Sequence, residues 1–277
     1  MNTEPTSTLN HTSTKRTALV TGASAGIGRE LAWVFARHGF DLILVARRRQ
    51  RLEELSIRLR EDCGVEARVL VFDLADPKAP ERIFDELSRS AVAVDALVNN
   101  AGYAISETFS ESSWREQADL IQVMSTAVAH LCHLFAPAMA KRGYGRILNV
   151  ASLTVYAPIV SSRAAGNLYA ATKSFVVQLS RSLSQELAGR GVHVTALCPG
   201  FTYSEFHDVM GTREAVRRLP SFLWMDARTV AEQGFDAVMR GDVVYINGWV
   251  NQLIAGLCTI IPNFITERCR PKLNRSL

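Results

Sequence analysis

Short apolar runs alternate with amphipathic stretches along most of the chain. Residues 41–46 (DLILVA) form a nearly continuous apolar run, as expected of a strand that is buried on both faces. Residues 47–64 place apolar side chains at helical spacing and end on Gly64, a residue that commonly follows a helix C-terminus. This alternation predicts βαβ units and therefore a parallel sheet.

The same pattern predicts the remaining elements. We expect further strands within residues 16–21, 67–74, 95–102, 145–152 and 192–200, and further helices at 27–39, roughly 112–141 and 169–190. These strands end in Gly, Asn, Ser or Pro, so polar groups gather at their carboxyl ends, the edge where open α/β sheets bind ligands. No internal repeat or clear linker interrupts residues 15–248. The sequence therefore predicts an α/β fold with a single domain over this range.

Composition narrows the class of protein. The chain has 277 residues, of which 48% are hydrophobic and 21% charged, ordinary values for a soluble globular protein. A net charge of +4 is too small to argue for nucleic acid as a partner. The five cysteines form no CxxC pair and do not flank His at metal spacing. They predict free thiols in a reducing compartment, hence a cytoplasmic protein without a metal site.

The two ends differ from the rest of the chain. Residues 1–14 are polar and rich in Ser and Thr, which predicts a disordered leader rather than a secretory signal. Residues 249–277 are apolar and then basic, and we expect a helical extension that packs on the domain or on an oligomer face. Peripheral membrane contact through 249–270 is the alternative. No run of 18 or more apolar residues occurs, so we expect no spanning helix.

The stretch TGASAGIG, 21–28, places three glycines between a strand and a helix. Glycine lets the backbone approach a ligand closely, and the following helix N-terminus offers N–H groups and a positive dipole end to a pyrophosphate. The spacing is GxxxGxG and differs from the GxGxxG dinucleotide fingerprint. A glycine-rich connection without a ligand is the alternative.

Four motifs occur in order: TGxxxGxG (21–28), NNAG (99–102), YxxxK (169–173) and PG (199–200). In this order they resemble the short-chain dehydrogenase/reductase family, over roughly residues 16–245. The resemblance implies a Rossmann-like doubly wound parallel sheet of about seven strands, with helices on both faces, that binds NAD or NADP. It also implies a homo-dimer or homo-tetramer.

The resemblance further implies which residues bind the cofactor. By their matching positions these are Gly22, Ser24, Ala25, Gly26, Ile27, Gly28, Asp73, Leu74, Asn99, Ala101, Gly102, Tyr169, Lys173, Pro199, Gly200 and Thr202. For Asn99 a structural hydrogen bond between strands is the alternative, and both roles are compatible.

Three arginines follow the second predicted strand, where dinucleotide folds discriminate NAD from NADP. An acidic residue there holds the ribose 2′-OH of NAD, and an Arg accepts the 2′-phosphate of NADP. This chain has Arg47, Arg48 and Arg49 and no carboxylate there. A helix N-terminus disfavours cations, so the arginines favour an anionic ligand. We expect NADP(H) over NAD(H), with Arg47 as the first phosphate-binding candidate and Arg48 as the second.

Tyr169 and Lys173 lie four positions apart and so share a helix face. Lowering a phenol pKa by about three units takes about 4 kcal/mol, and a cation about 5 Å away supplies roughly 3 kcal/mol at an effective dielectric of 20. We therefore expect Lys173 to tune Tyr169. The resemblance gives Tyr169 the proton transfer, Lys173 the tuning and the ribose hydroxyls, and Ser152 the substrate carbonyl. The alternatives are an ordinary amphipathic helix face and, for Ser152, a strand-end cap.

Two features depart from the family pattern. Ser152 and Tyr169 are 17 positions apart, more than is usual in the family, and the intervening loop contains Ser161 and Ser162. The place of a family Asn that supports a proton-relay water falls on Met124, next to Ser125. A methionine cannot relay a proton, so the relay is in question while cofactor binding is not.

The sequence thus predicts an NADP(H)-dependent oxidoreductase that interconverts a carbonyl and an alcohol on a small-molecule substrate. A flap after Pro199 contains Phe206, Val209, Met210, Leu219, Phe222, Leu223 and Trp224, which suits either an apolar substrate or internal packing. The alternatives are a dinucleotide-binding sensor or scaffold without turnover, and a related lyase or epimerase.

Overall fold

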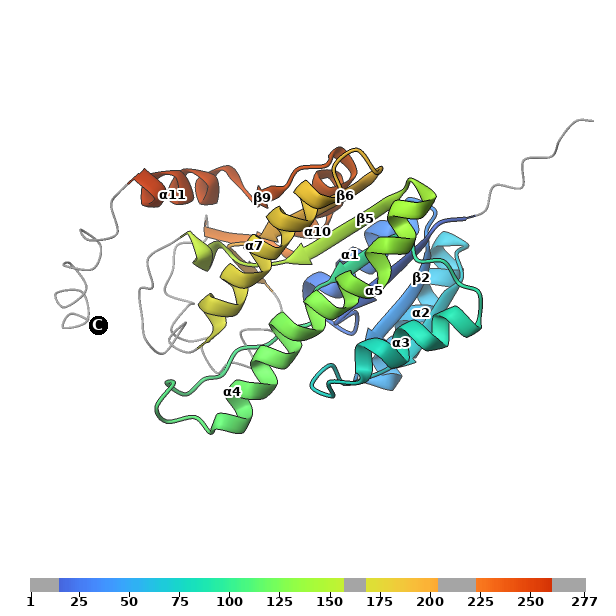
Figure 1. Cartoon of the computed structure of the whole chain (residues 1–277), viewed down its shortest axis with the longest axis horizontal. Helices are drawn as coiled ribbons and strands as arrows, with labels where there is room; N and C mark the ends of the chain where they lie inside the picture. The colour runs from blue at the N-terminus through green and yellow to red at the C-terminus, as the bar shows by residue number, and fades with distance from the viewer. Residues whose placement is uncertain (1–14, 157–167, 204–222, 261–277) are drawn as a thin grey trace, which may run out of the picture.

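The computed structural model describes residues 15–156, 168–203 and 223–260. Seven parallel strands form one sheet in the order β3-β2-β1-β4-β5-β6-β9 (Figure 1). They are β1 Thr17–Thr21, β2 Asp41–Ala46, β3 Ala67–Val71, β4 Ala96–Asn99, β5 Gly145–Val150, β6 Val192–Cys198 and β9 Val244–Ile246. The strand order reverses between β1 and β4, so we expect the ligand outside the carboxyl ends of these two strands. The predicted Rossmann-like α/β fold is confirmed.

Helices cover both faces of the sheet (Figure 1). One face carries α1 (Gly26–Arg37), α2 (Arg49–Cys63) and α10 (Ala227–Arg240). The other face carries α3 (Ala79–Arg89), α7 (Tyr169–Glu186) and a long helix built from α4 (Trp114–Ile121), η1 (Gln122–Thr126) and α5 (Ala127–Arg142). In β2, Leu42 and Leu44 enter the first core while Ile43 and Val45 enter the second, because successive strand side chains point to opposite faces.

Glycines end the two helices before β2 and β3 as the sequence predicts. Gly39 (φ +78°) follows the C-cap His38 of α1, and Gly64 (φ +64°) is itself the C-cap of α2. Both adopt the left-handed conformation, which costs a glycine little. The long helix differs from the prediction in one respect, because Gln122–Thr126 is a π-helical turn. Such wide turns often occur at functional sites.

The long helix Trp114–Arg142 has the length and apolar composition of a membrane-crossing segment, with 29 residues and a mean hydropathy of 1.4 in its most apolar window. Its side chains Leu120, Leu131 and Met139 nevertheless belong to a core cluster on the sheet. Core packing therefore accounts for its apolar character.

The C-terminal part of the described chain adds a small sheet and a helix. Strands β7 (Phe201–Tyr203) and β8 (Trp224–Asp226) pair in parallel, and α11 (Trp249–Ile260) follows β9. Figure 1 shows α11 beside β9, at the edge of the molecule. The sequence analysis did not locate β9 or β8, because three-residue strands carry almost no periodic signal.

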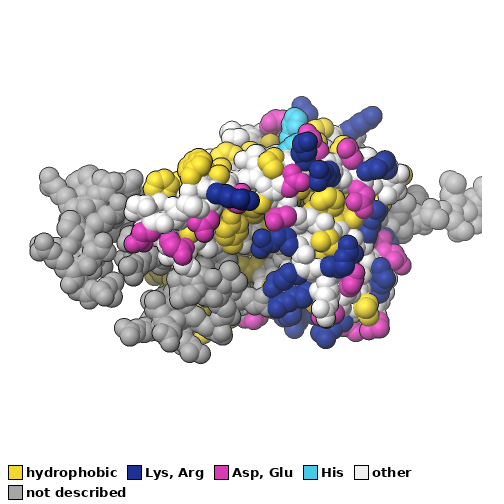
Figure 2. Space-filling model, turned by 90° about the horizontal axis from the view of Figure 1, so that it is seen from below, with side chains coloured by type: hydrophobic (Ala, Val, Ile, Leu, Met, Phe, Trp, Pro, Cys, Tyr) yellow, Lys and Arg dark blue, Asp and Glu magenta, His cyan; other side chains and the backbone are white. Residues whose placement is uncertain are grey.

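Some sequence predictions concern segments outside the described residues. These are the leader 1–14, the loop with Ser161 and Ser162, most of the flap with Phe206, Val209, Met210, Leu219 and Phe222, and the basic residues after position 260. Within the described part, Cys63, Cys132, Cys198 and Cys258 are free thiols. Figure 2 shows basic and acidic side chains close together on one side of the face that it presents.

Candidate active site

The glycine turn between β1 and α1 is a close crossing of two backbone segments. Gly22 (φ +68°) and Gly26 (φ +52°) are left-handed. A Cβ on Gly22 would lie 2.7 Å from Nδ2 of Asn100, and one on Gly28 would lie 2.4 Å from the Gly22 carbonyl oxygen. No side chain fits at either position, so the glycines are required by the geometry of the turn itself.

Asn100 organises this crossing and was missed in the sequence analysis. Its Nδ2 donates to the Thr21 carbonyl at 3.0 Å, and its backbone N–H donates to Thr21 Oγ1 at 3.0 Å. Thr21 Oγ1 also accepts from the Ala101 N–H at 3.1 Å and donates to the Val98 carbonyl at 3.2 Å. The signal was present as the second Asn of NNAG, but the role was given to the first.

Asn99 has the structural role that the sequence left open. Its Nδ2 donates to Asn149 Oδ1 at 2.8 Å, across a register pair of β4 and β5. Asn149 in turn donates to Ser180 Oγ at 2.9 Å, and Ser180 belongs to α7. This buried chain of amides ties the central strands to the helix that carries Tyr169 and Lys173.

The N-terminus of α1 is suited to an anion. Ala25, the N-cap, is extended and provides no side-chain hydrogen bond, and the first turn contains no acidic residue. Ser24, Ala25 and Ile27 are half-buried around it. Uncapped N–H groups at a helix start, together with the helix dipole, favour phosphate groups.

The three arginines after β2 have different partners in the structure. Arg48 donates from Nε and Nη2 to Ser24 Oγ at 3.2 and 3.0 Å, which places its guanidinium on the glycine turn. Arg47 Nη1 lies 3.7 Å from Asp73 Oδ2, with both side chains largely exposed, and Arg49 pairs with Glu53 at 3.5 Å. Arg48, the second candidate by sequence, is the arginine that contacts the turn.

Asp73 and Leu74 follow β3 and differ in exposure. Asp73 Oδ1 accepts from the Ala75 N–H at 3.0 Å while its other oxygen faces Arg47. Leu74 is buried in the core. Ala101 and Gly102 continue from Asn100, with Gly102 exposed. These residues lie at the carboxyl ends of β3 and β4, the same edge as the glycine turn.

Tyr169 and Ser152 come together from different elements. Tyr169 is the first residue of α7, and Ser152 follows β5 as the N-cap of a short 3₁₀ turn, Leu153–Val155. Burial raises the pKa of the Tyr169 phenol to about 12, and a hydrogen bond with the Ser152 side chain acts in the opposite direction. Ser152 Oγ also accepts from the Thr154 N–H at 3.2 Å.

Lys173 lies one turn further along α7 and is only 6% exposed. Its Nζ donates to the Val150 carbonyl at 2.8 Å and lies 5.7 Å from the Tyr169 ring centroid. Burial lowers the pKa of Lys173 to about 8, and the nearby Cys198 acts in the opposite direction. At neutral pH the ammonium form still predominates.

The expected tuning of Tyr169 by Lys173 is not found in the chain alone. The attraction between phenolate and ammonium is opposed by the desolvation of the phenolate. In the structure desolvation outweighs the hydrogen bond with Ser152, so the Tyr169 pKa lies above its ordinary value rather than below it. A phenol with a raised pKa is a weaker acid than a free tyrosine, so its phenolate must be stabilised when the proton leaves.

The end of β6 brings the PG segment to the same place. The Cys198 sulfur accepts from the Ser152 N–H, while burial raises the pKa of its thiol to about 12. The Leu153 N–H donates to the Pro199 carbonyl at 2.8 Å. Thr202 is buried, and its Oγ1 donates to the Gly200 carbonyl at 3.1 Å. The turn after β6 is thus held directly against the Ser152 turn.

Met124 lies in the π-helical turn at the place of the family Asn. It is buried, and its side-chain atoms lie 3.6 Å from where a Cβ on Gly102 would be. Met124 therefore packs beneath the NNAG segment, and Ser125 beside it is buried as well. The thioether provides packing here and no proton donor.

A parallel sheet with a glycine turn at its strand-order reversal and a Ser–Tyr–Lys group at its carboxyl edge defines a Rossmann-type protein of the oxidoreductase class. The profile of the short chain dehydrogenase family matches residues 16–215. The chain belongs to that family.

Named relatives of the chain differ in substrate. It is 35% identical over 190 residues to sulfoacetaldehyde reductase 2 of Chromohalobacter salexigens, covering 68% of this chain and 73% of that protein. A short-chain dehydrogenase from Sphingobium yanoikuyae, solved in complex with NADPH, has a TM-score of 0.77 at 33% identity, covering 89% and 96%. A bulky-bulky ketone specific alcohol dehydrogenase from Comamonas testosteroni has a TM-score of 0.72 at 30% identity, covering 89% and 95%.

Proposed function

We propose that the protein is an NADP(H)-dependent oxidoreductase that interconverts a carbonyl and an alcohol. The observation that carries the proposal is the contact between the Ser152 and Tyr169 hydroxyls, with the buried ammonium of Lys173 beside them. Two hydroxyl donors at one point suit a substrate oxygen that gains negative charge during reduction.

The residues of the chain fit the cofactor. The Gly22–Gly28 crossing leaves no space for a side chain, the start of α1 lacks a capping side chain, and the Arg48 guanidinium lies on the turn. These groups would hold the pyrophosphate and the 2′-phosphate. The NADPH complex of the Sphingobium relative supports the preference for NADP. The rest of the dinucleotide would be lined by Arg47, Asp73, Leu74, Ala101, Gly102 and the 199–202 segment.

Each catalytic side chain has a defined task. NADPH, when bound, supplies the hydride that reaches the substrate carbon. Tyr169 donates its proton to the substrate oxygen, and Ser152 donates a hydrogen bond to the same oxygen and orients it. Lys173, with a pKa of about 8, provides a cation that stabilises the phenolate after transfer. Because the raised pKa of Tyr169 makes its phenol a weaker acid, proton transfer depends on the cation of Lys173 and on the hydrogen bond from Ser152, which both favour the phenolate.

The substrate we propose is apolar. Beside the PG segment, the Tyr203 and Trp224 rings stack at 4.7 Å, and the Phe201 ring lies 5.6 Å from Trp224. Aromatic surface of this kind favours apolar ligands. The bulky-bulky ketone specific relative from Comamonas supports a large carbonyl substrate, whereas the relative from Chromohalobacter is a sulfoacetaldehyde reductase.

The test is NADPH consumption with a panel of aldehydes, ketones, quinones and 3-oxoacyl thioesters. We expect turnover with at least one apolar carbonyl. Tight NADPH binding without consumption of any compound would support a dinucleotide-binding sensor or scaffold instead. Conversion of a substrate without net NADPH loss would support a lyase or epimerase.

We also propose a homo-dimer or homo-tetramer that uses the outer face of α11. Trp249, Leu253 and Leu257 are 75%, 56% and 53% exposed and lie on one helix face at i, i+4 and i+8. Leu253→Glu should reduce the mass measured by light scattering, and unchanged mass would contradict this use of the face. Binding to anionic vesicles that Leu253→Glu abolishes would instead identify the membrane contact expected for 249–270.

We take residues 15–248 as one catalytic domain and α11 as the start of the extension 249–277. The free thiols of the described residues fit a reducing compartment, and we propose a cytoplasmic location.

A further inference from the structure

Asn251 of α11 is buried against the PG segment. It is 3% exposed, and a Cβ on Gly200 would lie 2.4 Å from its Nδ2 and 2.8 Å from its Cγ and Oδ1. The amide group therefore lies against the Gly200 backbone, in a space that only a glycine leaves open. Asn251 is thus a C-terminal side chain in direct contact with the segment that ends β6.

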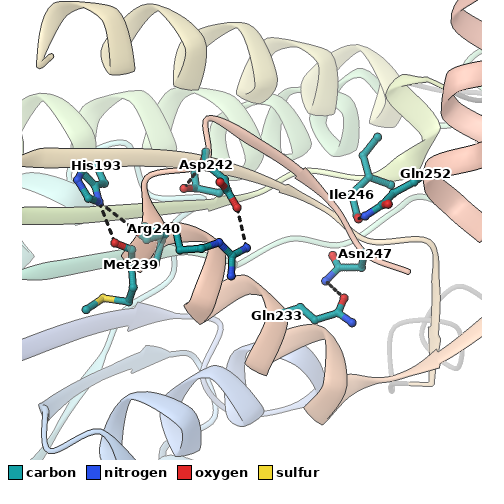
Figure 3. A network of polar contacts seen from close by, with 10 residues as sticks. His193, Gln233, Met239, Arg240, Asp242, Ile246, Asn247 and Gln252 are labelled. Carbon is teal, nitrogen blue, oxygen red and sulfur yellow. Dashed lines mark hydrogen bonds and ion pairs between the residues drawn. The ribbon is translucent and has the colours of Figure 1, made fainter. Parts of the chain in front are cut away.

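The amide is oriented by two further contacts. Its Nδ2 donates to the Asn247 carbonyl at 2.8 Å and approaches Met225 Sδ at 3.7 Å. Asn247 is itself fully buried, and its Nδ2 donates to Gln233 Oε1 at 3.1 Å, as Figure 3 shows. The carbonyl that holds Asn251 is therefore fixed to α10 and cannot follow a displaced α11 freely.

These contacts connect both strands of the small sheet. Met225 is the register partner of Thr202 in the β7–β8 pair, and Gly200 directly precedes β7. Thr202 Oγ1 donates to the Gly200 carbonyl, so a shift of Gly200 would displace the Thr202 hydroxyl as well. One buried amide thereby contacts both the residue before β7 and the central residue of β8.

We propose that Asn251 is a positioning residue that holds Gly200 and Thr202 in place for the nicotinamide end of the dinucleotide. The inference deepens the proposed function, because it assumes that the 199–202 segment meets that end. Asn251 acts through the backbone of Gly200 and has no direct part in the chemistry. A merely structural role in folding the C-terminal region would affect all ligands alike.

The experiment compares two ligands that share one end. NADPH spans the whole site, whereas 2′,5′-ADP carries only the adenosine and phosphate groups expected at the glycine turn and Arg48. Asn251→Ala removes the amide that packs against Gly200. We expect it to raise the Kd of NADPH about tenfold and to leave the Kd of 2′,5′-ADP within about twofold. Gln252→Ala is the matched control, because its exposed amide donates to the Ile246 carbonyl (Figure 3), whereas the atoms nearest to a Cβ on Gly200 belong to Asn251.

The two Kd values distinguish a positioning role of Asn251 from a general structural role. An equal loss of affinity for both ligands, or no change for either, would overturn the inference. If Asn251→Ala does not fold, Asn251→Ser, which keeps a small polar group, takes its place. We expect a smaller rise in the Kd of NADPH for this variant and again almost no change in the Kd of 2′,5′-ADP. If the unaltered protein binds neither ligand, the proposed function fails, and this result differs from any produced by the variants.

Discussion

The glycine turn and the Ser–Tyr–Lys group lie at the same sheet edge but are built differently. The turn depends on backbone proximity: Asn100 leaves space only for glycine, and the exposed Arg48 guanidinium donates to Ser24 beside it. The catalytic group depends on burial, which moves the pKa of Tyr169 to about 12 and that of Lys173 to about 8. Changes at the turn should therefore alter affinity, and changes at the catalytic group should alter proton transfer.

The largest expected effect is the loss of proton transfer in Tyr169→Phe. Removing the donor should lower kcat by about 10²–10⁴-fold, while the Kd of NADPH stays within about threefold. Tyr245→Phe is the control, because its ring in β9 contacts Arg240 and lies outside the site. Steady-state kinetics and fluorescence titration measure the two quantities. A kcat for Tyr169→Phe equal to that of the control would remove Tyr169 from the mechanism.

The burial of Lys173 predicts a pH dependence of stability. Its folded pKa of about 8 lies below the ordinary 10.5, so between these values the unfolded chain holds a proton that the folded chain has released. Stability should therefore rise with pH, by roughly 2 kcal/mol between pH 8 and 10. Lys173→Met should lack this rise and be the more stable protein at pH 7.

Urea unfolding of both proteins at several pH values checks this expectation. The measurement should stop near pH 10, because the raised pKa of Tyr169 makes stability fall between about 10 and 12. The same slope in both proteins would show that Lys173 titrates normally and is not buried as described.

The arginines offer a graded test of the turn. Arg48→Ala should raise the Kd of NADPH about 10–100-fold, the loss of one charge-assisted contact, and leave that of NADH nearly unchanged. Arg47→Ala should have a smaller effect, because Arg47 faces Asp73, and Arg49→Ala almost none, because Arg49 faces Glu53. Calorimetric titration of the three variants gives the order. An equal rise in the Kd of NADPH for all three variants would contradict the order, because it would show that the arginines act only through their summed positive charge.

Thr21→Val should have the smallest effect in this set and act on stability. The variant keeps the shape of the side chain but leaves the Asn100 and Ala101 N–H groups without the oxygen they share. We expect a loss of about 1–3 kcal/mol in the free energy of unfolding, with kcat nearly unchanged. A lower kcat at unchanged stability would place the turn in the chemistry rather than in binding.

The sequence predicted most of the sheet because buried parallel strands such as 41–46 are apolar runs, and because glycines mark the helix ends. It assigned the four family motifs by position. It did not predict that Arg48, rather than Arg47, contacts Ser24, since side-chain direction depends on how α2 begins. Asn100 and Asn251 were missed because their partners are distant in sequence, and the Tyr169 pKa was misjudged because desolvation requires the three-dimensional environment.

The most direct test of the central claim is isotope transfer from NADPH that carries deuterium at the transferable C4 position. With a carbonyl substrate found in the panel, mass spectrometry of the product should find the deuterium on the carbinol carbon. The unaltered protein should give this label and Tyr169→Phe should give almost none. A protein that binds NADPH tightly but never moves the deuterium to any carbonyl compound would contradict the account.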